Sequence, residues 1–132
     1  MEKEKKSITI KSDPKNISKA RRFVEIIAKQ YGFTDSQIFD IKVASGEAIS
    51  NAIEHGSPLG AKSNITVEAD FSKNCLELKV IDRGIFKKQV KVDNPDPRHR
   101  GRGIPFMLAL MDTVTIKEGK KGTTVKLIKK LK

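Results

Sequence analysis

Residues 46–56 read Gly-Glu-Ala-Ile-Ser-Asn-Ala-Ile-Glu-His-Gly, a stretch that sets a carboxylate, a carboxamide and an imidazole four residues apart. Each residue of an α-helix turns about 100°, so a four-residue step rotates by only about 40° and Glu47, Asn51 and His55 share a face. The same helix would carry an apolar stripe, made of Ala44, Ala48, Ile49, Ala52 and Ile53. Glu47 and Asn51 therefore flank a core-facing surface. Partial burial of a carboxylate costs free energy unless a partner or ligand compensates it, which points to a functional role.

A Glu and an Asn at this spacing also occur by chance on solvated helix faces. Two further segments favour a ligand site over that alternative. Residues 80–85 form an apolar run that ends in Asp82 and Gly84, and residues 100–104 read Arg-Gly-Arg-Gly-Ile ahead of a helical apolar pattern. A carboxylate at a strand end can accept a hydrogen bond from a purine amino group, and glycines at a helix start let backbone N–H groups approach phosphate. In this order, the three segments predict a nucleotide site.

These residues resemble the GHKL ATPases and, within them, the small bacterial anti-sigma factor serine kinases. Residues 47–56 resemble the N box of that family, and Asp82-x-Gly84 resembles its first glycine box. Residues 101–104, together with Leu110-Met111-Asp112, resemble the second glycine box, and Gly122-Thr123-Thr124-Val125 also matches. Each motif is short, but their joint order and spacing are specific, and together they cover nearly the whole chain.

The resemblance implies roles for five of these residues. Asn51 is expected to be the Mg²⁺ ligand, and Glu47 the general base that polarises the attacking hydroxyl or water. Asp82 is expected to specify adenine, with Gly84 leaving room for the ring and Thr123 supporting the adenine end. The alternatives are a surface amide for Asn51, an ion pair with a lysine for Glu47, and a plain strand-ending turn at Asp82.

Two glycines and the arginines beside them are the expected phosphate contacts. Gly101 and Gly103 would offer unobstructed backbone N–H groups, and Arg100 and Arg102 can bind phosphate oxygens bidentately. Arg102 lies inside the matching motif and is the candidate for stabilising charge during phosphate transfer. His55, at the expected helix end, is assigned to hydrogen bonding with the last carbonyls and not to catalysis.

Two residues depart from the family pattern. Phe86 stands where many members have the second glycine of Asp-x-Gly-x-Gly, and Pro105 follows Ile104 where some members have a further glycine. Both are compatible with the anti-sigma branch, whose glycine boxes look looser than those of the large ATPases. They bear on nucleotide affinity and lid closure more than on the fold.

The length of 132 residues fits one domain, 1–132, because no linker, repeat or low-complexity tract divides the chain. No apolar run approaches the roughly 20 residues needed to cross a bilayer, and the first residues lack an apolar signal-peptide core. A cytoplasmic protein is therefore expected. Cys75 is alone, which excludes an internal disulfide and favours a buried structural thiol.

The net charge of +11, from 27 Lys and Arg against 16 Asp and Glu, raises the question of nucleic-acid binding. The lysines are scattered and gather at the termini, and a single tyrosine with no tryptophan offers little for base stacking. Solvated charge that attracts an acidic protein partner or opposes the charge of ATP is the favoured interpretation. Neither direct nucleic-acid binding nor membrane binding is expected.

Hydrophobic periodicity predicts an α+β, two-layer α/β sandwich with a mixed, mostly antiparallel sheet and helices on one face, and the resemblance implies that this sandwich is of the Bergerat (GHKL ATPase) type. The expected elements are a strand over 7–11, a helix from Asp13-Pro14 to Gly32, a helix from Thr34 or Asp35 to Gly56, a hairpin of strands 65–71 and 76–80 around Ser72-Lys73-Asn74, a loop over 86–100 with room for a short strand at 90–92, a helix over 104–111, and a closing hairpin of strands 113–117 and 123–128 joined by 118–122.

The resemblance implies an ATP-binding anti-sigma factor with protein serine/threonine kinase activity. Using ATP and Mg²⁺, such a protein phosphorylates a small STAS-type anti-sigma factor antagonist, which controls whether it holds a sigma factor, and it pairs as a homodimer. The alternative is a regulatory module in which ATP shapes a partner-binding surface without phosphate transfer. A histidine-kinase catalytic fragment is disfavoured because only His55 and His99 are present and no phospho-acceptor segment precedes the ATP site.

Overall fold

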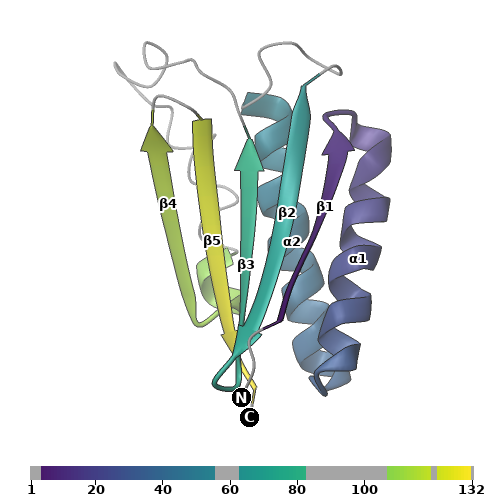
Figure 1. Ribbon diagram of the computed structural model, residues 1–132, viewed down its shortest axis with the longest axis vertical. Helices are drawn as coiled ribbons and strands as arrows, with labels where there is room; N and C mark the ends of the chain where they lie inside the picture. Colours follow the sequence, from purple (N-terminus) through teal and green to yellow (C-terminus); the bar gives the residue numbers. More distant parts are fainter. Residues whose placement is uncertain (1–3, 56–62, 83–106, 120–121, 132) are drawn as a thin grey trace.

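A five-stranded sheet with two long helices on one face makes up the described part of the chain, residues 4–55, 63–82, 107–119 and 122–131 of the computed structural model (Figure 1). The elements in chain order are β1 (Glu4–Lys11), the 3-10 turn η1 (Pro14–Asn16), α1 (Ile17–Gln30), α2 (Asp35–His55), β2 (Asn64–Ser72), β3 (Cys75–Asp82), β4 (Thr113–Gly119) and β5 (Gly122–Lys130). Residues 107–110 are also helical.

The strand order is β1-β2-β3-β5-β4, and every neighbouring pair among the described strands is antiparallel. The predicted two-layer α+β architecture is confirmed, and the expected mixed sheet is antiparallel throughout its described pairings. Predictions for residues 86–100, including the short strand at 90–92, and for the first turn of the helix over 104–111 lie outside the described residues.

The first helix begins and ends at the predicted signals. The Asp13 carboxylate accepts a hydrogen bond from the Lys15 backbone N–H at 3.1 Å, and the first turn that it caps is a 3-10 turn, so the α-helix itself starts only at Ile17. After Gln30 the chain reaches Gly32, whose φ of +90° is a left-handed conformation that glycine adopts without a steric penalty.

The second helix begins with a reciprocal pair of capping hydrogen bonds. The Thr34 hydroxyl accepts from the Gln37 backbone N–H at 3.1 Å, and the Gln37 side-chain oxygen accepts from the Thr34 backbone N–H at 3.1 Å. This is a capping box, so of the two expected candidates Thr34, and not Asp35, caps α2. The helix then extends 21 residues to His55, and the expected stop at Gly56 lies outside the described residues.

The hairpin of β2 and β3 turns where the sequence predicts. Lys73 and Asn74 have φ values of 52° and 62°, as a two-residue turn of the type that matches strand twist requires. Both strands are longer than expected, since pairing continues from Ser72 opposite Cys75 to Ile65 opposite Asp82. Cys75 begins β3 on the face away from its buried neighbour Leu76, and is half-buried instead of buried as predicted.

The closing hairpin is tighter than the sequence predicts. Residues 118–122 were expected to form the loop, but β4 extends to Gly119 and β5 starts at Gly122, and these two glycines are paired across the strands. Cross-strand hydrogen bonds thus override the weak strand preference of glycine. Only residues 120 and 121 lie between the two strands.

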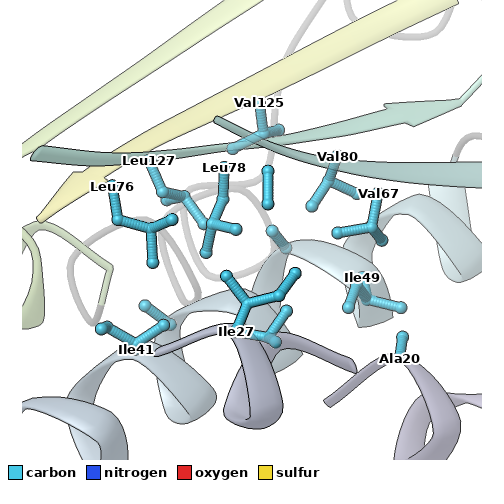
Figure 2. Close-up of a cluster of buried hydrophobic side chains, with 14 of the residues drawn as sticks. Ala20, Ile27, Ile41, Ile49, Val67, Leu76, Leu78, Val80, Val125 and Leu127 are labelled. Carbon is cyan, nitrogen blue, oxygen red and sulfur yellow. The ribbon is translucent and has the colours of Figure 1, made fainter. Parts of the chain in front are cut away.

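The core lies between the sheet and the two helices (Figure 2). Figure 2 shows side chains from the strands pointing toward side chains from α1 and α2. The fully or almost fully buried members include Ala20, Val24, Ile27, Ile41, Ala44, Ala48, Ile49, Ile65, Val67, Leu76, Leu78, Val80 and Leu127. The predicted apolar stripe of α2 is therefore confirmed, and it fixes which side of this helix faces the sheet. Among the described residues, no helix has the length and apolarity needed to span a membrane.

Candidate functional site

Glu47 and Asn51 lie one turn apart on α2, at the margin of the core. Both are half-buried, whereas Ala48 and Ile49 between them are fully buried against the sheet. In the described part of the chain neither polar side chain makes a hydrogen bond or an ion pair. Buried polar groups are ordinarily hydrogen-bonded, so within the described residues these two partly buried side chains are the candidates for contact with a ligand.

Asp82 is the last residue of β3, and it is only 6% exposed. Its Oδ1 accepts a hydrogen bond at 3.2 Å from the backbone N–H of Thr123, the residue opposite it on β5. The alternation of Leu78, Val80 and Asp82 along β3 puts the carboxylate on the helix-covered face of the sheet. The structure thus brings Asp82 and Thr123 together at the strand ends.

The helical pair and the strand pair lie at the same end of the molecule. In Figure 1, β3 ends and β5 begins at the end of the sheet where α2 reaches its C-terminus. Glu47 and Asn51 belong to the C-terminal half of α2, and this helix packs on the face toward which Asp82 points. The carboxylate of Glu47, the carboxamide of Asn51 and the buried carboxylate of Asp82 therefore lie on the same face and toward the same end of the sheet.

The remaining predicted site residues cannot be compared in the same way. Gly84, Gly101, Arg102 and Gly103 lie outside the described residues, as do Phe86 and Pro105. His55 is the last residue of α2, as expected, but its side chain is not among those described. The roles assigned to these residues stay predictions.

A basic groove between α1 and α2 was not predicted. It is an open hollow of about 520 Å³ lined by Ser18, Lys19, Arg21, Arg22, Glu25 and Lys42. The single acidic residue, Glu25, forms ion pairs with Lys42 at 3.2 Å and with Lys29 at 3.6 Å. A hydrogen bond and the charge of Lys42, assisted by Lys29, lower the pKa of the Glu25 carboxyl. Positions 18, 21, 22 and 25 recur at helical spacing and therefore share one face of α1, which is the signal in the sequence that could have identified the groove. From the sequence alone, the lysines are instead interpreted as scattered surface charge.

The side chain of Arg21 crosses α2 beside the residue that precedes Glu47. A Cβ atom on Gly46 would lie 3.2 Å from the Arg21 Nε and 3.4 Å from its Cδ, so the missing side chain makes room for the arginine. The Nε is buried and has no hydrogen-bond partner. The α1–α2 contact next to Glu47 is consequently set by a glycine and an arginine from different helices.

A family model and individual known proteins both match this chain over most of its length. Residues 10–129 match the family described as histidine kinase-like ATPase domain. The chain is 28% identical over 137 residues to the anti-sigma F factor of Clostridium beijerinckii, a match that covers 98% of this chain and 96% of that protein. It is 29% identical over 133 residues to the serine-protein kinase RsbW of Bacillus velezensis, covering 92% of this chain and 82% of that protein.

Among solved structures, the chain is similar to the crystal structure of the RsbU and RsbW domains of a Mycobacterium tuberculosis protein. The TM-score is 0.74 and the sequence identity 25%. The match covers 97% of this chain but only 32% of that longer chain, so the similarity concerns one part of the M. tuberculosis protein.

Proposed function

This chain belongs to the family of histidine kinase-like ATPase domains, and from that premise we propose that it is an anti-sigma factor with ATP-dependent protein serine/threonine kinase activity. It phosphorylates a small antagonist protein of the STAS type, and this modification decides whether the chain holds a sigma factor. Similarity over most of its length to an anti-sigma F factor and to a serine-protein kinase supports this assignment. The observation that supports the site is the half-buried pair of Glu47 and Asn51 on α2, whose side chains make no hydrogen bond or ion pair with any other described residue.

The described residues fit ATP and Mg²⁺. Mg²⁺ takes few protein oxygens and keeps waters and phosphate oxygens, so the carboxamide oxygen of Asn51 is a suitable ligand. A carboxylate has about four acceptor positions, so Asp82 can accept from the amino group of adenine while it keeps the hydrogen bond from Thr123. Gly84, Gly101 and Gly103 lie outside the described residues; in this proposal Gly84 would leave room for the ring, and Gly101 and Gly103 would offer their backbone N–H groups to the phosphates.

In the phosphate transfer, Glu47 acts as the general base. It takes the proton of a serine or threonine hydroxyl as the hydroxyl oxygen bonds to the γ-phosphorus and the bond from that phosphorus to the bridging oxygen of ADP breaks. Bound Mg²⁺ neutralises charge on the phosphate oxygens. Asn51 orients this centre one turn from the base, and Arg102 stabilises the charge that develops on the transferred group.

The proposal extends to location and assembly. The chain acts in the cytoplasm as a homodimer, with a sigma factor and the antagonist as its protein partners, and without direct contact to nucleic acid or membrane. The groove lined by Lys19, Arg21 and Arg22 supports an acidic protein partner, because these three cations have no ion pair in the described part of the chain. Sedimentation of the purified protein tests the homodimer.

The kinase is tested with γ-labelled ATP, Mg²⁺ and a candidate antagonist. We expect label on the antagonist with the wild-type chain, none with Glu47→Gln at undiminished ATP binding, and no Mg²⁺-dependent ATP binding with Asn51→Ala. The alternative function, a module in which ATP shapes a partner-binding surface, predicts nucleotide-dependent partner binding with no label transferred. Equal transfer by wild type and Glu47→Gln would exclude the assigned base.

A further inference from the structure

The face of the sheet that points away from α1 and α2, which we call the outer face, is not covered by any element of the described ranges. Figure 1 shows both helices on the opposite side, where the core lies. Side chains alternate along a strand, so the residues between the buried positions point outward. On β2, for example, Val67 and Ala69 are buried, so Glu68 and Asp70 point to the outer face.

Charges of opposite sign lie on different strands of the outer face. There β2 carries two acids and no base, β5 carries two bases and no acid, and β3 between them carries one of each. In that order the residues are Glu68 and Asp70, Lys126 and Lys130, and Glu77 and Lys79. The edge strands add lysines, of which Lys5 on β1 forms an ion pair with Glu68 at 3.7 Å. The acidic strand and the basic strand therefore flank β3.

One acid of the outer face has an unsatisfied oxygen. The Oδ1 of Asp70 is buried and has no hydrogen-bond partner, although buried acceptors are ordinarily bonded. Asp70 lies opposite Lys5 on β1 and Glu77 on β3. The ammonium group of Lys5 pairs with Glu68 instead, and a like charge directly opposite is unfavourable. A cation from another molecule would compensate both.

A second copy of this chain fits these charges. In a symmetric dimer the same patch of both chains meets itself. With a two-fold axis along β3, β2 of one copy lies over β5 of the other, so the strand of Glu68 and Asp70 faces the strand of Lys126 and Lys130, and symmetry repeats the contact. Each chain carries a net charge of +11, so two copies repel each other unless acidic and basic surfaces are matched in this way.

The outer face also leaves the other proposed surfaces open, because the basic groove and the pair of Glu47 and Asn51 belong to the helical layer. Its size is adequate for a dimer. With strands about 4.8 Å apart and residues about 3.3 Å apart, the five strands have a footprint of roughly 24 by 26 Å, or about 600 Å². Side-chain relief adds to that area, and a stable interface buries about 800 Å² of each partner.

We propose that the outer face of the sheet is the homodimer interface, with β2 of each copy lying over β5 of the other. This rests on the homodimer of the proposed function and names the surface that forms it. The lysines of the second copy supply the cation that Asp70 lacks within its own chain. Both nucleotide sites and both basic grooves stay open in the dimer.

Sedimentation of the full chain tests the interface with two double variants. Glu68→Lys with Asp70→Lys makes both strands basic, and Lys126→Glu with Lys130→Glu makes both acidic. For each variant alone we expect the dimerisation Kd to rise at least about a hundredfold, because like charges meet. Mixed in equal amounts, the two variants should form a dimer with a Kd within about tenfold of wild type, since acid again meets base. The control Lys19→Glu, an exposed charge on α1, should dimerise as wild type does.

Wild-type Kd values for both folded variants, or no dimer in their mixture, overturn the proposal. If the β2 variant does not fold, the β5 variant decides alone, and a wild-type Kd there overturns it equally. Cys75, the only cysteine, points to the outer face and reports on it in the wild-type chain. Its alkylation by excess N-ethylmaleimide should slow as the protein concentration rises and the dimer forms, and an unchanged rate contradicts the interface.

None of these measurements needs a nucleotide or a substrate, so the interface and the kinase fail separately. A wild-type chain that stays monomeric rejects the homodimer and its interface, but not the phosphate transfer. A charge-dependent dimer that transfers no label to an antagonist supports the interface and rejects the proposed kinase alone.

Discussion

Two half-buried glutamates of the helical layer have different environments. Glu25 on α1 lies 3.2 Å from Lys42 and 3.6 Å from Lys29, whereas Glu47 on α2 has no ion pair in the described part of the chain. An ion pair with a lysine was the ordinary alternative for Glu47, and that alternative is not formed there. One glutamate is paired within the fold, and the other is the one for which we propose a role toward a ligand.

Glu25 should make stability depend on pH. Its pKa is lowered in the folded chain, chiefly by Lys42, so its contribution is present above the unfolded value near 4.5 and is lost as pH falls through the lower folded value. Glu25→Gln should therefore be less stable than wild type at pH 7, and the two unfolding free energies should converge below pH 4.5. Urea unfolding at several pH values measures this. A difference that persists unchanged at the lowest pH would contradict the ion-pair origin.

Among the elements, α2 depends most on how it starts, because its far end carries Glu47 and Asn51. Thr34→Ala removes the hydroxyl that accepts the Gln37 N–H, and we expect it to lower the free energy of unfolding by about 1 kcal/mol. Thr34→Ser keeps the acceptor and should stay close to wild type. Ser36→Ala, at an exposed position in the same turn, should not destabilise. Chemical denaturation compares the three, and equal losses in Thr34→Ala and Thr34→Ser would refute the capping role.

The elements predicted best from the sequence are those set by neighbouring residues. The cap at Thr34 and the turn at Lys73 and Asn74 follow from side chains and φ preferences within a few positions. Strand ends were predicted too short, because pairing with a neighbouring strand carries residues such as Gly119 into the sheet whatever their own preference.

Contacts between side chains are likewise predictable only where residues close in the sequence determine them. Spacing on one helix predicts that Glu47 and Asn51 share a face, since the helical period alone decides it. No such period relates Lys129 to Asp40, or Arg21 to Gly46, because these contacts join elements that are distant in the sequence. Their discovery needed the folded arrangement of the two helices and the sheet.

At the scale of the whole molecule, the proposed ligand would connect the two layers. Asn51, the proposed Mg²⁺ ligand, belongs to the helical layer, whereas Asp82, the proposed adenine contact, belongs to the sheet. A nucleotide that contacts both layers binds the native chain and not the unfolded one, so it must stabilise the fold by linkage.

Thermal unfolding checks this linkage without any protein partner. With Mg·ATP at about 100 times its Kd, the stabilisation should be about 2.7 kcal/mol, which raises Tm by several degrees. Removing Mg²⁺ with a chelator should abolish most of the shift if Asn51 holds the nucleotide through the metal, as proposed. Asn51→Ala should melt near the wild-type temperature without nucleotide, since the carboxamide has no partner in the described part of the chain, and should show no shift with it. A shift of equal size in wild type and Asn51→Ala would place the nucleotide somewhere other than the stripe of α2 that carries Glu47.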